Sequence, residues 1–349
     1  MQGDLIPIPP FLQPLLERAG VDFQAALLRT GARPQAEGGR WRLNTAQFFA
    51  FWNAVEAAGV APGFGLQLPS SVASHQFDVA SAAALLSENF GEALARLARY
   101  KRLTCPEDIE LTLTGTEAQV RLLWLRAGSA VPSLVIDGVF AWLYQLAGIG
   151  TGMSKTLRPL RIEMTRAPAH EALLGQHFGC PIHFNAPSDL IVFAQETLTL
   201  PFTSHHPEML ELMLPGLEAA LKARAASASL TQQVREILAR RMRGQRPSVE
   251  LVARDLCMSP RTLQRRLEEE SASYQRLLDD VRQETARHLL SATNLDAGEI
   301  AFVLGFEELN SFTRAFQGWE GTSPNRWRTN KMSKMSNKAQ AGTRRRALQ

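Results

Sequence analysis

Two groups of long hydrogen-bonding side chains lie in the last third of this 349-residue sequence, at spacings typical of a helix surface. The first group is Arg261, Gln264 and Arg265. Leu263 and Leu267 are four residues apart, so a helix near residues 260–269 would turn the leucines inward and the polar side chains outward. Arginine can pair with guanine, and glutamine with adenine, at base edges in the major groove of DNA. The chemistry that this pattern predicts is base recognition.

The second group follows further along the chain and has the same design. Asn310, Ser311, Thr313 and Arg314 would point outward from a helix whose inward positions are Phe312, Phe316 and Trp319. Serine, asparagine and arginine side chains donate hydrogen bonds both to base edges and to phosphates. A duplicated surface of this kind favours contact with nucleic acid over a merely solvated helix face.

Each group needs a preceding helix and turn to position it. In the first unit, Leu251, Val252 and Leu256 share one face of a short helix, and Ser259 and Pro260 are residues favoured at the start of the next helix. The sequence therefore predicts a helix-turn-helix.

The second unit repeats this arrangement. Ile300, Ala301 and Leu304 are its packing positions, Gly305 suits the left-handed residue that ends a helix, and Phe306 would fill the turn. Two helix-turn-helix units in one chain are therefore expected.

Residues 274–292 (YQRLLDDVRQETARHLLSA) have apolar side chains at helical spacing and contain neither Pro nor Gly. A continuous linker helix is expected here, and it would fix the distance between the two polar helices. Arg282 on this helix is expected to reach phosphates or to pair with carboxylates. The two polar helices would then read major-groove segments about 10 base pairs apart.

These residues resemble the AraC/XylS family of bacterial transcription regulators. The likeness covers roughly Leu230 to Arg328 and is strongest in IAFVLGFEELNSFTRAFQGWEGTSPNRWR. It implies two recognition helices in successive major grooves on one face of double-stranded DNA. The positions that contact bases in the family fall here on Arg261, Gln264, Arg265, Leu309, Asn310 and Arg314, and we add Ser311 as a DNA contact. Leu309 is apolar where the family often has a hydrogen-bonding residue. Glu307 and Glu308 oppose phosphate contact, so the second unit is expected to bind more weakly.

Charge is divided unevenly along the chain. Residues 229–349 hold 21 Lys and Arg against 14 Asp and Glu, whereas the remainder holds 17 against 20. A basic C-terminal part behind a slightly acidic N-terminal part is typical of a nucleic-acid module attached to another domain. Beyond Arg328 the chain has basic but no acidic residues and no apolar period, which predicts disorder.

Bulk properties limit the class of protein. The 45% hydrophobic fraction is ordinary for a globular chain. We find no run of about 18 apolar residues and no basic segment of a secretory signal at the start, so a cytoplasmic protein without a membrane partner is expected. Cys105, Cys180 and Cys257 are too widely spaced for a disulfide framework, and Cys257 is expected to be a small buried residue.

The N-terminal part has a mixed pattern. Alternating runs at 108–115 and 118–126 predict a hairpin around Thr116–Glu117, further strands are expected at 159–165 and 189–194, and an apolar central helix at 133–146. SAAALLSENFGEALARLARYKRL and CPIHFNAPSDLIVFAQETLTLPF resemble the arabinose-binding-type sensor domain of one AraC subgroup, which implies binding of a small molecule and dimerisation. The helix expected at 207–226 would either pack on its own domain or form the dimer contact.

Catalytic and metal-binding patterns give no support for an enzyme. The sequence has no G-x-S-x-G, P-loop, H-E-x-x-H or Rossmann fingerprint, and its Gly148–Gly152 run follows a helix rather than a strand. His177, Cys180 and His183 have a metal-like spacing without a fourth clustered ligand, so a structural loop is the better interpretation. No enzyme activity, cofactor or metal is expected.

The predicted fold is an α+β sensor domain followed by an all-α domain with two helix-turn-helix motifs joined by a linker helix. We assign residues 1–222 to ligand sensing and dimerisation, 223–229 to a linker, 230–330 to DNA binding and 331–349 to a basic tail. The predicted function is effector-controlled, sequence-specific regulation of transcription, with activation expected because the family mostly activates. Promoter DNA, a small-molecule effector, RNA polymerase and a second copy of the chain are the expected partners. Two alternatives remain open: an architectural DNA-binding protein and an enzyme with a fused regulatory domain.

Overall fold

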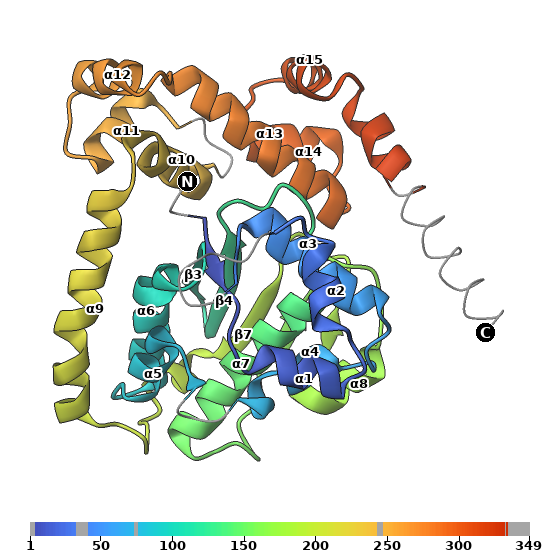
Figure 1. Ribbon diagram of the computed structural model, residues 1–349, viewed down its shortest axis with the longest axis vertical. Helices are drawn as coiled ribbons and strands as arrows, with labels where there is room; N and C mark the ends of the chain where they lie inside the picture. Colours follow the sequence, from blue (N-terminus) through green and yellow to red (C-terminus); the bar gives the residue numbers. More distant parts are fainter. Residues whose placement is uncertain (1–3, 33–40, 73–75, 243–246, 332, 334–349) are drawn as a thin grey trace. The chain divides into compact units, whose positions relative to one another are not determined.

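The computed structural model describes residues 4–32, 41–72, 76–242, 247–331 and 333. The chain divides into two compact units (Figure 1). The first consists of residues 1–124 and 131–227, and the second of residues 125–130 and 228–349. The first unit is α+β and the second is built from helices, which confirms the predicted fold class.

The first unit contains a five-stranded sheet in the order β3-β4-β7-β5-β6. Its strands are β3 (Glu107–Thr114), β4 (Glu117–Trp124), β5 (Arg161–Glu163), β6 (Ile182–His183) and β7 (Leu190–Ala194). The pairs are antiparallel except for β5 with β6, and a separate short pair joins β1 (Ile6–Pro7) to β2 (Arg42–Leu43). The hairpin between β3 and β4 pairs Thr114 with Glu117, so its loop is Gly115–Thr116, one residue earlier than predicted.

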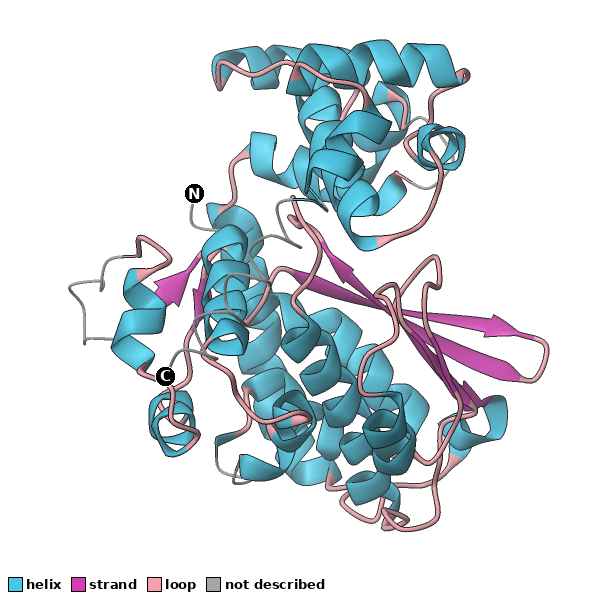
Figure 2. Cartoon of the chain, turned by 90° about the vertical axis from the view of Figure 1, so that its right-hand side faces the viewer, coloured by secondary structure: helices cyan, strands magenta, loops and turns pink. Residues whose placement is uncertain are grey.

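Helices of the first unit gather on one side of this sheet (Figure 2). They are α1 (Leu12–Arg18), α2 (Phe23–Leu28), α3 (Thr45–Ala57), α4 (Phe64–Gln67), α5 (Val79–Leu85), α6 (Phe90–Tyr100), α7 (Ser133–Thr151), α8 (Glu171–Phe178) and α9 (Pro207–Ser227), with short 3-10 turns η1 (Pro69–Ser71), η3 (Lys101–Leu103) and η4 (Gln195–Thr199). Leu94 of α6 and Phe140 of α7 pack against Val120 and Phe193 of the sheet in one buried core. Asn44 and Asn89 cap α3 and α6, because each side chain accepts a backbone N–H three residues on.

Among the described residues, α7 is the helix long and apolar enough to cross a membrane by length and composition. Within the domain, however, 61% of its apolar window is buried. The helix ends at Gly152, whose φ of 71° is the left-handed conformation that glycine adopts at low cost. The glycine-rich run from Gly148 therefore belongs to a helix terminus, as its sequence context predicts.

The second unit is formed by α10 (Leu230–Arg241), α11 (Val249–Asp255), α12 (Pro260–Glu269), α13 (Tyr274–Ala292), α14 (Ala297–Val303) and α15 (Leu309–Glu320), and residues 324–331 are also helical. One apolar core joins these helices, including Leu263, Leu278, Ile300 and Phe312. Helix α9 continues to Ser227, so residues 223–227 of the expected linker are helical. From residue 334 on, the expected basic tail lies outside the described residues.

Candidate nucleic-acid interface

Helices α11 and α12 form the first helix-turn-helix. The Ser248 side chain accepts the N–H of Leu251 at the start of α11, and the Ser259 side chain accepts the N–H of Thr262 at the start of α12. Pro260 occupies the first turn of α12, where its missing N–H costs nothing. The start of α12 at Ser259 and Pro260 agrees with the sequence prediction. These caps fix the direction in which α12 leaves the turn.

The turn between the two helices depends on a left-handed residue. Cys257 has a φ of 54°, its N–H donates to the Arg254 carbonyl, and the Met258 N–H donates to the Ala253 carbonyl. This conformation directs the Cys257 side chain to solvent, so the prediction that it is buried is wrong. In the second helix-turn-helix, Gly305 takes the place that Cys257 has in the first, with a φ of 68°. The prediction of a left-handed glycine there is confirmed.

Helix α12 places its polar side chains as the sequence predicts. Leu263 and Leu267 are fully buried, whereas Arg261, Gln264 and Arg265 are exposed. Arg265 forms an ion pair with Glu269 on the same helix, and both side chains are more than half exposed. Exposed pairs of this spacing contribute only about 0.3–0.5 kcal/mol. The guanidinium can therefore exchange this partner for another acceptor at small cost.

Helices α14 and α15 form the second helix-turn-helix. The side chains of Asp296 and Glu299 form a reciprocal capping box at the start of α14. Phe312 and Phe316 of α15 are fully buried. The outward residues are Leu309, Asn310 and Arg314, which are exposed, and Ser311, which is half-buried.

Arg282 has a different role from the one predicted. It is only 5% exposed, and its Nε and Nη2 atoms donate to the carbonyls of Leu304 and Gly305 at 3.0 and 2.9 Å. Its guanidinium also lies 4.2 Å from the centre of the Phe306 ring. These contacts are made to backbone carbonyls, where a phosphate or a carboxylate was expected. Arg282 satisfies the carbonyls at the end of α14 and holds the turn that leads to α15.

A second set of partly buried contacts holds α15 against α13. One Glu320 oxygen accepts from Gln283 at 2.7 Å and from Arg287 at 2.6 Å, and the other accepts from the Trp327 indole at 3.2 Å. Arg328 donates to the carbonyls of Leu290 and Leu295. Trp327 and Arg328, the final W-R of the sequence motif, thus help to position α15. The position of this W-R pair at the end of the motif is the signal that could have identified its role.

The first helix-turn-helix is held in a similar way. Arg235 of α10 pairs with Asp280 at 2.8 Å and with Glu284 at 2.5 Å on α13. Glu270, just after α12, accepts the N–H groups of Leu230 and Thr231 at 2.8 Å and so caps α10. Because both motifs are anchored to α13, that helix sets their separation.

The length of α13 is of the same order as the spacing of major-groove segments in DNA. Its 19 residues have an axial length of roughly 28 Å at the α-helical rise. Successive major-groove segments on one face of DNA are about 34 Å apart. Figure 1 shows α12 and α15 toward opposite ends of α13, within the same unit.

Metal-ligating side chains do not cluster within the described ranges. No group of three or more His, Cys, Asp and Glu side chains there could hold a metal ion. His177 instead packs edge-on against Tyr144 and Phe178.

Two family models match the chain. The arabinose-binding N-terminal domain of the AraC transcription regulator matches residues 20–202, and a helix-turn-helix domain matches residues 252–330. The ornithine utilization regulator of Pseudomonas aeruginosa is 29% identical over 331 residues, which cover 93% of this chain and 97% of that protein. The regulator VirS of Mycobacterium tuberculosis is 26% identical over 82% of this chain and 84% of its own length.

Solved structures that match this chain include the transcriptional regulator CdpR from Pseudomonas aeruginosa, with a TM-score of 0.43 and 20% identity over 91% of this chain and 98% of that one. The DNA-binding domain of AdpA, solved with a target DNA, gives a TM-score of 0.27 and 27% identity over 31% of this chain and 96% of that one. From the two family models, which together cover most of its length, this chain belongs to the AraC family of transcription regulators, with an arabinose-binding-type N-terminal domain and a C-terminal helix-turn-helix domain.

Proposed function

We propose that this protein is a sequence-specific regulator that reads promoter DNA with α12 and α15 under the control of a small-molecule effector bound to the first unit. The observation that carries the proposal is the pair of helices with buried apolar faces and exposed polar faces, both anchored to α13. Arg261, Gln264 and Arg265 read one major-groove segment. These three side chains are exposed, and the helix that carries them is capped at its start and packed through its apolar face. They are therefore able to reach base edges.

The second helix reads the next segment less strongly. Asn310 and Arg314 supply its hydrogen bonds to bases. Ser311 adds a contact from a shorter side chain, and Leu309 adds an apolar contact suited to a thymine methyl group. Leu309 is 47% exposed, so it is not needed for the core. Exposed Glu307 and Glu308 lie just before the helix and repel phosphates. Most of the affinity for DNA is therefore assigned to the first helix-turn-helix, formed by α11 and α12.

Effector control is supported by the arabinose-binding-type domain. The relative named for ornithine utilization covers nearly the whole chain, so we assign this protein to the control of small-molecule metabolism. We assign it the role of a cytoplasmic activator that acts with RNA polymerase rather than that of an enzyme.

We place dimerisation on the outer face of α9. Leu210 and Leu217 are buried within its own unit, whereas Met209 and Leu212 are 47% and 78% exposed.

The test is capture of sheared genomic DNA on the full-length protein at roughly physiological salt, followed by sequencing. A few sharp sites with two half-motifs one helical turn apart are expected. Broad enrichment without a motif, both with and without extracts of small metabolites, would instead identify an architectural DNA-binding protein. A matched double variant, Arg261→Ala with Arg265→Ala, should lose one half-motif and keep the other.

A further inference from the structure

The first unit contains a cavity of about 320 Å³. Its walls come from the N-terminal segment, α3, the α4–η1 region, the start of α5, the η3–β3 region, the end of β4 and α7, all within that unit. This volume is at the lower end of the range, about 300–1,000 Å³, that small-molecule sites occupy. Size alone therefore permits a compact organic ligand.

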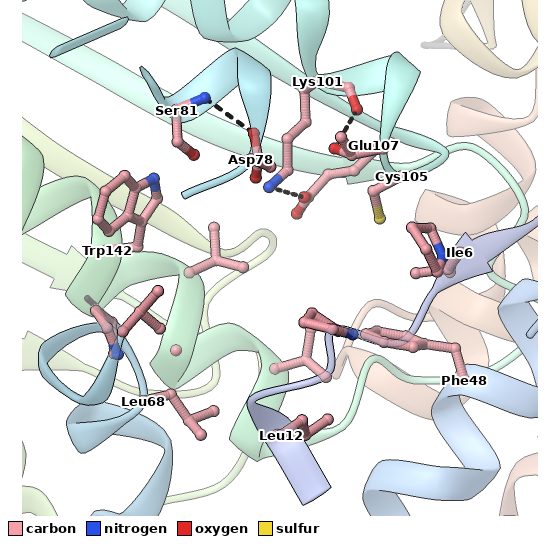
Figure 3. A pocket seen from close by; sticks show the side chains of 18 of the residues that line it. Ile6, Leu12, Phe48, Leu68, Asp78, Ser81, Lys101, Cys105, Glu107 and Trp142 are labelled. Atoms are coloured by element: carbon pink, nitrogen blue, oxygen red, sulfur yellow. Dashed lines mark hydrogen bonds and ion pairs between the residues drawn. The ribbon is translucent and has the colours of Figure 1, made fainter. Parts of the chain in front are cut away.

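The cavity has two chemically different walls (Figure 3). Asp78, Lys101 and Glu107 lie along one wall, and Leu12, Leu68 and Phe48 lie along the opposite one. Binding sites typically combine an apolar lining with a few convergent polar groups. A ligand that matches both walls needs an apolar body with polar atoms on one side.

Unsatisfied polar atoms concentrate in this cavity. Among the described residues, six buried side-chain polar atoms have no hydrogen-bond partner, and four of them belong to residues that line it. These four are the indole Nε1 atoms of Trp52, Trp124 and Trp142 and the Oε1 atom of Glu107. Buried polar atoms in native proteins are nearly all paired. Three donors and one carboxylate acceptor, all on residues that line one space, thus lack a partner within the described part of the protein.

The polar wall carries an excess of negative charge. Glu107 is 1% exposed and Lys101 is its ion-pair partner, with Nζ 3.9 Å from Oε2. Asp78 brings a second carboxylate, whose side chain accepts the Ser81 N–H. Burial acts to lower the pKa of Lys101, but Asp78 and Glu107 together raise it, so the ammonium is retained. Burial raises the pKa of Glu107, as expected for a carboxylate that lacks a full counter-charge.

Aromatic rings complete the lining. Phe48 stacks on Trp124 with ring centres 5.7 Å apart, and Phe77 packs on Trp142 at 4.8 Å. Indole and phenyl faces attract cations as well as apolar rings. The electrostatics of the wall and of the rings therefore favour the same sign of ligand charge.

We propose that this cavity is the effector site and that it takes a compact organic cation, in which an apolar ring or ring-sized body carries a protonated amine and an oxygen acceptor. The amine donates to Glu107 Oε1, the body packs between Phe48 and Leu68, and the oxygen accepts from an indole N–H. This inference rests on the proposed function only in naming the ligand as the effector.

The test uses the full-length protein and three phenolic probes of similar size that differ in charge: tyramine, the neutral alcohol tyrosol and the anion 4-hydroxyphenylacetate. Binding is followed by tryptophan fluorescence and by the shift in melting temperature. Tyramine is expected to bind roughly tenfold or more tightly than the other two, since it alone makes a charge-assisted hydrogen bond with Glu107.

Variants connect the result to the cavity. Glu107→Gln should remove the preference for tyramine, and the matched control Glu196→Gln, at an exposed carboxylate outside the cavity, should keep it. Trp142→Phe keeps an aromatic ring but removes the indole N–H. It should weaken the binding of all three probes without changing their order of affinity, which gives a second readout if Glu107→Gln does not fold. Equal or tighter binding of tyrosol or the anion, no saturable binding of tyramine at millimolar concentration, or an unchanged preference in Glu107→Gln would overturn the inference.

The genomic capture experiment separates this inference from the proposed function. Sharp DNA sites together with failure of the probe test would leave a specific regulator whose effector is of another class. Preferential binding of tyramine without specific DNA sites would leave the cavity assignment and remove the regulatory role.

Discussion

Replacement of Arg282 gives the sharpest test of how the second helix-turn-helix is held. Arg282→Met keeps the aliphatic stem but removes both donors to the Leu304 and Gly305 carbonyls. Each hydrogen bond from a charged donor contributes about 1.5–3 kcal/mol, and a partly buried cation–π contact about 1–2 kcal/mol. Partial rehydration of the exposed carbonyls offsets some of this, so we expect a loss of about 3–4 kcal/mol.

That loss is large beside the total stability of about 5–15 kcal/mol for a typical domain. It should act locally, because the partners of Arg282 belong to the end of α14. The assay is amide hydrogen exchange over residues 297–320, which reports the free energy of local opening. Protection there should fall by roughly a hundredfold or more in Arg282→Met, and less in Arg282→Lys, which keeps the charge but loses the planar pair of donors.

The matched control is Arg276→Met, at an exposed arginine on the same helix. Exchange in α14 and α15 should not change in that variant. Unchanged exchange in Arg282→Met, together with a reduced salt dependence of DNA affinity, would refute the positioning role and restore a phosphate contact.

Four further predictions concern single positions. Cys257→Gly relieves a left-handed residue that carries a side chain, so urea unfolding should show about 0.5–1 kcal/mol of added stability, whereas Gly305→Ala should cost about 1 kcal/mol. Arg265→Ala should relax base preference at one operator position by about 1–3 kcal/mol in binding-site selection, and uniformly weaker binding to every sequence would contradict base reading there. The Arg99 guanidinium and the Tyr100 hydroxyl lower the pKa of Glu218 from 4.5 to about 2. The contact between α6 and α9 should therefore be intact above about pH 4.5 and weaken as pH falls toward 2, and Glu218→Gln should remove that pH dependence from hydrogen exchange in α9.

The helix-turn-helix units were predictable because local residues determine them. Ser259 and Pro260 fix the start of α12, and apolar residues at helical spacing select its buried face, so its predicted range agrees with the structure. The role of Arg282 was not predictable in this way, because its acceptors are backbone carbonyls more than 20 residues away and no side-chain pattern encodes them. Cys257 was misjudged because residue type suggested burial while the backbone conformation of the turn decides exposure.

The first unit was predictable only in its elements. Alternating residues indicated the hairpin of β3 and β4, but not that β7 pairs with β4 and lies between β4 and β5. The cavity is lined by Trp52, Glu107 and Trp142, among others. These residues come from separate segments of the chain, which packing alone brings together. None of them stands out along the sequence, where each has the pattern of a core residue or of a strand start.

Helix α13 acts as a ruler, because both helix-turn-helix motifs are anchored to it by ion pairs and hydrogen bonds. A ruler of fixed length restricts how the proposed operators can evolve. Substitution of a base changes one contact and can be compensated at other positions. Insertion of a single base pair between the half-sites moves one of them by about 3.4 Å and rotates it by about 35° around the DNA axis. Operators of this protein should therefore diverge in sequence while the spacing between their half-sites stays constant.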